Sequence, residues 1–225
     1  MNADDLLAIL FQAHPWHGIP PGDPEGVINA YIEIVPSGVV KYELDKPSGH
    51  LRIDRPQRYS SLTPSLYGFV PQTYTGERVA ARCSERTGLP ALRGDGDPMD
   101  ICVLSEKEHA HGGFLLHARV VGGLRMLDGD EVDDKLLAVL EQDLVFGKMR
   151  DVSQVPTELV DRLRHYFLSY KQLPGAGARK VRIAEVYGRE EAVEVLRRSM
   201  EDYRAKFGSP EERARKLREI LGGGR

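Results

Sequence analysis

The stretch Asp95-Gly96-Asp97-Pro98-Met99-Asp100 decides how the rest of the chain is interpreted, because it places three carboxylates in one short turn. Its glycine can adopt positive φ, and its proline fixes its own φ and restricts the preceding aspartate. The three side chains can therefore point to one place, and carboxylate oxygens are the ligands that Mg²⁺ prefers. The following residues, 100–104, predict a strand, so the turn would lie at the end of a rigid element.

A second acidic cluster follows, Asp128-Gly-Asp130-Glu131-Val-Asp133-Asp134-Lys135, before the apolar run 136–140. Asp, Gly and Pro are also the ordinary residues of turns, so either cluster alone is most simply a solvated turn. Two acidic turns that each adjoin a strand can instead converge on one site for several metal ions. The sequence leaves both interpretations open at this point.

The composition is that of an ordinary globular protein. The chain has 225 residues, of which 41% are hydrophobic, and a net charge of −3, which suits one well-buried domain. No basic excess favours nucleic acid or an anionic membrane, and no apolar run approaches the ~20 residues that cross a bilayer. The N-terminus lacks the pattern of a signal peptide, and Cys83 and Cys102 are too few for a disulfide framework. We therefore expect a cytoplasmic protein without nucleic-acid or membrane partners.

Alternating residues predict a meander of short antiparallel strands in the first third of the chain. The polar positions of these strands include Glu33, Lys41 and Glu43. A solvent-exposed polar face is usual for antiparallel sheets, whereas a polar face that lines a cavity requires the sheet to close into a barrel. The predicted strands are 30–35, 39–44, 50–54 and 66–70.

The remaining segments predict helices that flank this sheet. The segment 71–94 is read as a long connection, which is uncommon without a function. Its four arginines either reach an anion or, more simply, solvate the loop. The predicted elements are strands at 114–127 (broken at Gly122-Gly123), 135–140 and 180–187, helices at 5–11, 157–171 and 189–207, and a helix from the capping box at 209–212 to about residue 221.

The polar residues combine many carboxylates with several cations and tyrosines. Carboxylates alone would suit metal storage, but added cations suggest a small, highly charged anion held between metal ions and basic side chains. Phosphate esters and anhydrides fit this description. Their hydrolysis needs a water activated by the metals and neutralisation of the leaving oxygen. The groups concerned are Lys41, Arg55, Lys135, Lys171, Tyr67 and Tyr170.

The turn at 95–100 resembles the signature of the family I soluble inorganic pyrophosphatases, and the likeness continues in register over about residues 28–187. Several motifs in the order of the family are more specific than any one of them. The matching segments are Tyr31-Ile-Glu-Ile34, Val40-Lys-Tyr-Glu-Leu-Asp45, Ile53-Asp-Arg55, Tyr67-Gly68, Asp128 with Asp133 and Lys135, and His165-Tyr-Phe167 to Tyr170-Lys171.

The resemblance implies a fold and an activity. The fold is α+β, a small, mostly antiparallel OB-like five-stranded β-barrel with flanking helices. It would form a single pyrophosphatase domain over 1–225, with a core of about 28–187 and a C-terminal helical extension of about 189–221. The activity is hydrolysis of inorganic pyrophosphate to two orthophosphates by a metal-activated water, with several Mg²⁺ ions per site. Family members also form homo-oligomers, either hexamers or dimers.

The resemblance assigns a role to each matched position. Asp97 would be the catalytic base. The metal ligands would be Asp95, Asp100, Asp128, Asp133 and Glu33. The substrate would be bound by Lys41, Arg55, Lys135, Tyr170 and Lys171, with Glu43 and Tyr67 in supporting positions.

The chain departs from the family pattern at two positions near the site. Thr63 stands where a second tyrosine is common, and Gly129 stands where an acidic residue often follows Asp128. Three alternatives remain beside the enzyme: a non-enzymatic Ca²⁺ or Mg²⁺ binding module, an OB-type nucleic-acid binder and a phosphatase of wider range. The first leaves the cations and tyrosines unexplained, and the acidic net charge counts against the second.

Overall fold

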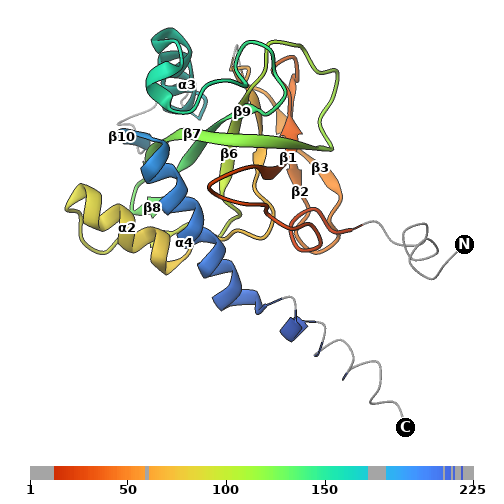
Figure 1. The fold of residues 1–225 in the computed structure, drawn as a ribbon, viewed down its shortest axis with the longest axis vertical. Coiled ribbons are helices and arrows are strands. Elements are labelled where there is room, and N and C mark those ends of the chain that lie inside the picture. The colour runs from red at the N-terminus through yellow and green to blue at the C-terminus, as the bar shows by residue number, and fades with distance from the viewer. Residues whose placement is uncertain are drawn as a thin grey trace, which may run out of the picture.

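Five strands form a ring at the centre of the computed structural model (Figure 1). They pair in the order β1 (Ile28–Ile34), β4 (Leu66–Phe69), β6 (Asp100–Leu104), β9 (Lys135–Leu140) and β7 (Phe114–Asp128), and β7 returns to pair with β1. Only β6 and β9 run parallel. This ring-like sheet agrees with the predicted OB-like barrel. The structure describes residues 13–58, 61–171, 181–209, 211–213, 215 and 219.

The long strand β7 holds the ring together because it pairs with β1, β9 and β10 (Val181–Gly188) along different parts of its length. A sequence-based break at Gly122-Gly123 was expected and is wrong, since β7 is continuous there. The pairing with β9 shifts register between Val120 and Gly122, and such a bulge bends a strand without ending it. The two glycines make room for β10, because a Cβ atom at either position would lie 2.6 Å or less from an atom of Tyr187.

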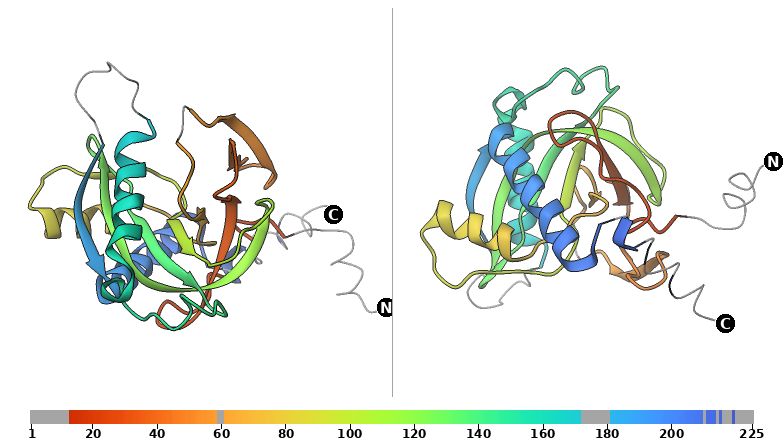
Figure 2. Two further views of the ribbon diagram at one scale, coloured as in Figure 1. Left: turned by 90° about the horizontal axis from the view of Figure 1, so that it is seen from above. Right: turned by 60° about the horizontal axis from the view of Figure 1, so that its bottom comes forward.

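Two smaller pairings complete the strands. β2 (Val40–Leu44) and β3 (Leu51–Pro56) form a separate antiparallel hairpin beside the ring, seen edge-on in Figure 2. β5 (Arg93–Gly94) runs parallel to β8 (Glu131–Val132), which itself pairs with the end of β7. The two acidic segments at 95–100 and 128–135 are therefore neighbours in space.

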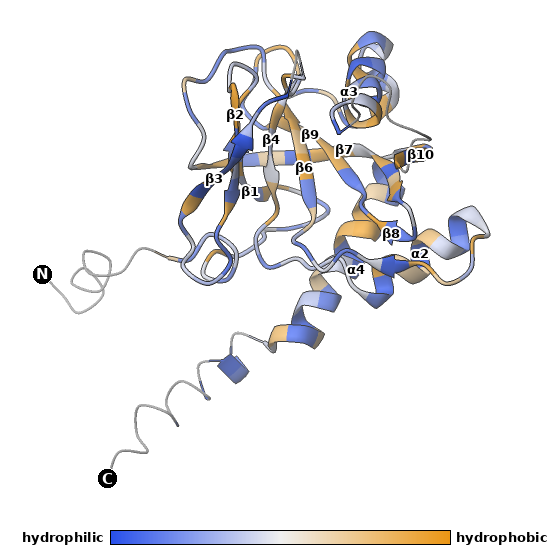
Figure 3. Ribbon diagram, turned by 180° about the vertical axis from the view of Figure 1, so that it is seen from behind, coloured by the Kyte–Doolittle hydropathy of each residue, from blue (hydrophilic) through white to orange (hydrophobic). Residues whose placement is uncertain are grey.

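The helices cover the outside of the ring. α3 (Thr157–Ser169) packs on one side through Leu163 and Phe167. α4 (Arg189–Phe207) packs across another side next to α2 (Glu77–Thr87), as Figures 1 and 2 show. Hydrophobic positions on the ring strands and on the inner faces of the helices form the core (Figure 3). The short 3₁₀ helix η1 (Val152–Gln154) precedes α3.

Helix α2 corrects the reading of 71–94 as an unstructured connection. The helix buries only Val79, Ala80 and Cys83, so its apolar face is short, although that face is well separated from its charged residues. The four arginines of segment 71–94 each pair with a carboxylate, so none of them reaches a free anion. The pairs are Arg78 with Asp202, Arg82 with Glu191, Arg86 with Glu185, and Arg93 with Asp130.

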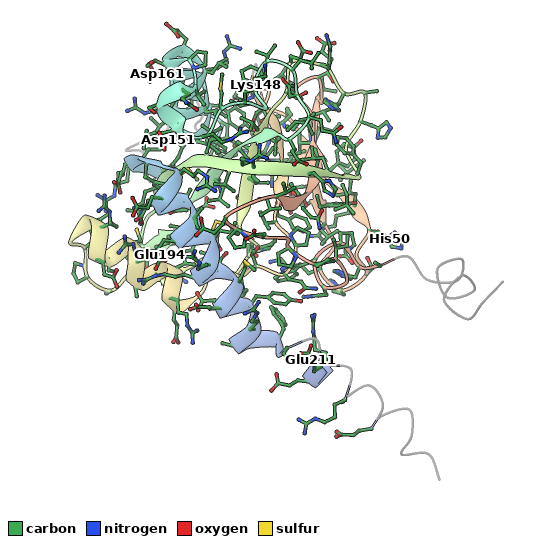
Figure 4. All side chains as sticks on the ribbon, viewed as in Figure 1. His50, Lys148, Asp151, Asp161, Glu194 and Glu211 are labelled. Carbon is green, nitrogen blue, oxygen red and sulfur yellow. The ribbon has the colours of Figure 1, made fainter. Side chains whose placement is uncertain are left out.

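The start of α4 is fixed by a side chain from another segment. Asp151, labelled in Figure 4, accepts a hydrogen bond from the Arg189 N–H at 2.8 Å. Beyond the helix, Ser209 and Glu212 exchange hydrogen bonds in the predicted capping box. The rest of the predicted last helix and the helix at 5–11 lie largely or wholly outside the described residues.

An aromatic cluster joins the start of the described chain to the end of α4. Trp16, which is 4% exposed, packs edge-on against Phe207 and beside Tyr203. Its indole N–H donates to the Thr73 carbonyl at 2.8 Å. Among the described residues, no helix has the length and apolar character needed to span a membrane.

Candidate active site

The turn 95–100 is held rigidly from behind by the segment before α2. Gly96 has a φ of +79°, the left-handed conformation that favours glycine. The Thr75 N–H donates to the Asp97 carbonyl at 2.8 Å, and the Gly96 N–H donates back to the Thr75 carbonyl at 3.1 Å. The Asp97 N–H also donates to the Asp95 carboxylate at 2.9 Å. The backbone is therefore fully engaged, which leaves the side chains to face the adjoining cavity.

The second acidic segment comes beside the first through sheet pairing. Asp100 at the start of β6 lies directly across from Lys135 at the start of β9. Gly129 has a φ of +69°, so the position where an acid was expected is occupied by the residue that suits the turn between β7 and β8. The next acid, Asp130, pairs with Arg93. Asp128 and Asp133 face the same cavity as the first turn.

A cavity of about 620 Å³ gathers all but one of the predicted site residues. The polar face of the first strands therefore lines a cavity, the second of the two readings of its sequence. A bulge in β1 falls at Glu33, whose carboxylate turns toward the hairpin and accepts the Leu44 N–H at 2.7 Å. The predicted residues that line the cavity are Glu33, Lys41, Glu43, Tyr67, Asp95, Asp97, Asp100, Asp128, Asp133, Lys135, Tyr170 and Lys171.

Arg55 is the predicted residue that does not line the cavity. It lies across from Lys41 in the β2–β3 pairing, and its guanidinium donates to the Pro56 carbonyl at 3.3 Å. Thr63 is buried, and its hydroxyl donates to the Ser65 carbonyl at 3.2 Å. Thr63 is therefore not a substitute for a second tyrosine at the acidic cluster.

Lys135 occupies the centre of the acidic wall. It is only 2% exposed, and its ammonium contacts both the Asp100 and the Asp133 carboxylates. Burial alone would lower the pKa of Lys135, but these two carboxylates raise it well above its usual range. The Tyr67 hydroxyl donates to the same Asp100 carboxylate at 2.5 Å. The ammonium is thus a permanent positive charge within the site.

The other cations stand nearer the rim, each beside an acid. Lys171 contacts the Asp128 carboxylate at 2.8 Å, and Lys41 contacts Asp54 at 2.9 Å and also Glu43. The Lys46 ammonium contacts Asp97, with both side chains 51% exposed. The sequence reading missed Lys46, which it treated only as part of the turn 46–49. A basic residue directly after the Val40–Asp45 motif was the available signal.

The buried carboxylates carry more negative charge than their surroundings balance. Burial raises the pKa of Glu33 to about 8, although the Leu44 N–H opposes this shift. Burial, followed by repulsion from Asp133, also raises the pKa of Asp95. Burial raises the pKa of Asp100 too, against the attraction of Lys135. Clustered shifts of this kind are typical of functional sites, and added positive charge would relieve them.

The donor atoms suit a hard divalent cation, because the acidic wall offers carboxylate oxygens. In the part of the chain that the structure describes, no three acidic, histidine or cysteine side chains are gathered closely enough to hold an ion. The Lys135 ammonium contacts both the Asp100 and the Asp133 carboxylates and neutralises part of their charge. The carboxylate oxygens present fit Mg²⁺ by their chemistry.

Comparisons with known proteins all point to one family. The family model described as inorganic pyrophosphatase matches residues 30–204. An inorganic pyrophosphatase of Chlamydia trachomatis is 46% identical over 196 residues, which cover 85% of this chain and 94% of that protein. A soluble inorganic pyrophosphatase of rice, Oryza sativa, is 35% identical over 195 residues, covering 86% and 80%.

Solved structures give the same result. The crystal structure of the inorganic pyrophosphatase of Thermus thermophilus superposes with a TM-score of 0.70 at 29% identity and covers 86% of this chain and 99% of that one. The enzyme of Neisseria gonorrhoeae superposes with a TM-score of 0.68 at 30% identity, covering 82% and 96%. By its sequence, its ring of strands and its acidic cavity, the chain belongs to the inorganic pyrophosphatase family.

Proposed function

We propose that this protein hydrolyses inorganic pyrophosphate to two orthophosphates with Mg²⁺ as its cofactor. One observation carries the proposal: the Lys135 ammonium is buried between Asp100 and Asp133 in a cavity that also holds Lys41 and Lys171. A site for metal storage needs no ammonium groups. A diphosphate held between metal ions and basic side chains needs both charges on facing walls.

The metal ligands in this proposal are the carboxylates of the cavity. The bound Mg²⁺ ions would supply positive charge to the phosphate oxygens and acidify the attacking water. The raised pKa values of Glu33 and Asp95 support this, because these groups lack the positive charge that a carboxylate prefers. The proposed ligands are Asp95, Asp100, Asp128, Asp133 and Glu33.

Asp97 is proposed as the base that accepts the proton of the attacking water. Its backbone is fixed on both sides by hydrogen bonds, yet its carboxylate is half exposed and faces the cavity. A base needs this combination of a fixed position and an accessible oxygen. Tyr67 supports the site by donating to Asp100, since burial and nearby carboxylates raise the pKa of its hydroxyl and keep it protonated.

The basic side chains and Tyr170 are proposed to bind the two phosphates. Lys135 would bind a phosphate through the ammonium that contacts Asp100 and Asp133 in this structure. Lys41 and Lys171 contact acids at the rim and would neutralise charge on the leaving phosphate, with Glu43 holding Lys41 in position. Arg55 would first have to release the Pro56 carbonyl to join them.

We also propose one domain over the chain, a homo-oligomer and a cytoplasmic location. The family match extends from the predicted core into α4, which supports a single domain. Cys83 and Cys102 are both free and buried, which supports a reducing compartment. Size-exclusion chromatography with light scattering on the purified protein would distinguish a dimer from a hexamer.

The deciding experiment is release of phosphate from pyrophosphate by the purified protein. We expect rapid release with Mg²⁺, none with a chelator present, and little release from ATP or phosphate monoesters. No release, with Mg²⁺ bound, would favour the binding module instead. Equal release from several phosphoanhydrides would favour the phosphatase of wider range.

A further inference from the structure

Asp134 lies between two residues of the proposed site but faces away from it. Its neighbours Asp133 and Lys135 line the cavity, whereas Asp134 does not and is only 2% exposed. Successive side chains of an extended segment point in opposite directions, which explains this division. A carboxylate buried behind the site is costly unless it is hydrogen-bonded or paired, so its partners show what it does.

Tyr187 of β10 is one partner. Its hydroxyl donates to the Asp134 carboxylate at 3.1 Å, and its side chain is 3% exposed. Tyr187 lies opposite Gly123 of β7, where a Cβ atom would come within 2.5 Å of the tyrosine hydroxyl. Because Gly123 has no Cβ atom, there is space at this position for the Tyr187 ring, whose hydroxyl reaches Asp134.

Arg125 faces the same pair from β7. Its side chain is fully buried, and its guanidinium lies 5.0 Å from the centre of the Tyr187 ring. Two of its nitrogens contact Glu185 and Glu191. Its third nitrogen, Nη1, has no hydrogen-bond partner among the described residues, and neither has Asp134 Oδ1.

The two acids that contact Arg125 also form ion pairs with arginines of α2. Glu185 also contacts Arg86, and Glu191 also contacts Arg82, so both acids are shared between Arg125 and an arginine of α2. These ion pairs fix the position of the Arg125 guanidinium, and its positive charge attracts the Asp134 carboxylate. The segment that carries Asp133 and Lys135 is therefore held, on the side away from the cavity, by the hydrogen bond that Asp134 accepts from Tyr187 and by the attraction of Asp134 to Arg125.

We propose that Asp134 is a positioning residue that fixes the separation of Asp133 and Lys135 in the cavity. Tyr187 orients its carboxylate, and Arg125 holds it by charge. The inference rests on the proposed function, because it assumes that Asp133 binds metal and Lys135 binds phosphate. Groups that hydrogen-bond to a metal ligand commonly change metal affinity by about 10- to 100-fold when they are removed, and Asp134, which acts through the backbone, should have an effect at the low end of that range.

The test is the variant Asp134→Asn, which keeps the shape of the side chain and removes its charge. Binding of Mg²⁺ without substrate is measured by titration calorimetry, and KM and kcat are measured at saturating Mg²⁺. For Asp134→Asn we expect Mg²⁺ affinity to fall about tenfold or more and the KM for pyrophosphate to rise, while kcat changes much less. Tyr187→Phe, which removes only the hydroxyl, should give a smaller change in the same direction.

Asp143→Asn is the matched control. Asp143 is another buried carboxylate, but it accepts N–H groups of Glu106, Val145 and Phe146, away from the cavity. It should lower the melting temperature without changing Mg²⁺ affinity. Equal losses of affinity in Asp134→Asn and the control, or wild-type affinity in Asp134→Asn, would overturn the proposal.

Two further results keep the test decisive. If Asp134→Asn does not fold, wild-type Mg²⁺ affinity in Tyr187→Phe would also overturn the positioning role. If the unaltered protein releases no phosphate from pyrophosphate, the proposed function itself fails. That result is separate from the calorimetric comparison of the variants.

Discussion

The cavity and the end of the molecule formed by α2 and α4 both bury carboxylates, but they satisfy them differently. Asp202 of α4 is 4% exposed and accepts backbone N–H groups of Gly76, Arg78 and Val79 at the start of α2. The positive end of the helix dipole and the Arg78 guanidinium add to this. Asp202 therefore caps the N-terminus of α2 and has a structural role.

The cavity carboxylates have fewer such donors: Glu33 accepts one backbone N–H, from Leu44, and Asp95 accepts one, from Asp97. Burial and then the repulsion of nearby acids raise the pKa values of both groups. Burial of an acid is therefore not in itself a mark of function in this protein. The informative feature is a buried acid whose surroundings leave negative charge uncompensated, because such a group gains most from an added cation.

The largest effect is expected at Asp97. Asp97→Asn removes the proposed proton acceptor and almost no volume, so kcat should fall by about 10²- to 10⁴-fold while the melting temperature changes little. Steady-state kinetics at saturating Mg²⁺, together with thermal unfolding, would measure both. Turnover close to that of the wild type would remove Asp97 from the role of base.

The counterpart at the other end is Asp202→Asn. It weakens the contacts to the first turn of α2, so the free energy of unfolding should fall by about 1–3 kcal/mol. Its kcat should remain within about twofold of the wild-type value, since that range is far below a general-base effect. A variant that lost turnover but kept its stability would contradict the contrast between the two regions.

An intermediate effect is expected from pH in the metal-free protein. The pKa of Glu33 is raised from 4.5 to about 8, so between these values the folded chain binds more protons than the unfolded chain. The free energy of unfolding should therefore fall as pH rises from about 6.5 to 8. Burial lowers the pKa of His17 to about 4, which has the opposite effect, but that contribution is complete above about pH 6.5.

Melting temperatures across this window would test the interpretation. Saturating Mg²⁺ should reduce the fall, because a ligand that binds only the folded state stabilises it. Glu33→Gln should reduce the slope of the metal-free profile without abolishing it, because burial also raises the pKa of Asp95 to about 8 and that of Asp134 to about 7. A constant melting temperature for the metal-free protein between these pH values would show that the cavity charges are already balanced.

The smallest effect is expected at Lys46. Its ammonium contacts Asp97 but is half exposed, so Lys46→Met should raise KM for pyrophosphate by only about three- to fivefold. Lys107→Met is the control, because Lys107 is more exposed and pairs only with its neighbour Glu106. Identical KM values for the two variants would show that Lys46 takes no part in binding.

The sequence predicts an element best where several apolar residues recur along its whole length. The predicted helix 189–207 and strand 135–140 have the bounds that the structure shows. Helix α2 escaped prediction because its buried face consists of small residues, and its arginines looked unpaired until Glu185, Glu191 and Asp202 were brought near by folding. Pairing across more than 90 residues leaves no local pattern in a sequence.

The same limit applies to the site. The order of the motifs along the chain predicted which residues line the cavity. Two residues differ from that prediction because of where their side chains point. Arg55 follows the predicted strand 50–54 and lies within β3, where its guanidinium donates to the Pro56 carbonyl. Lys46 contacts Asp97 from a turn of ordinary composition. The support behind the site at Asp134 depends on the space at Gly123, which is visible only when β7 and β10 are paired.

The position of Trp16 has a practical consequence. It is the single tryptophan of the chain, it lies in the cavity wall, and its indole is bonded to the Thr73 carbonyl. The hydroxyl of that threonine accepts the Met99 N–H at 2.9 Å, one residue before Asp100. Tryptophan emission of the unlabelled protein, excited at wavelengths that tyrosine does not absorb, therefore arises from one residue. That residue is connected to the acidic turn through two hydrogen bonds, so its emission can report events in the turn.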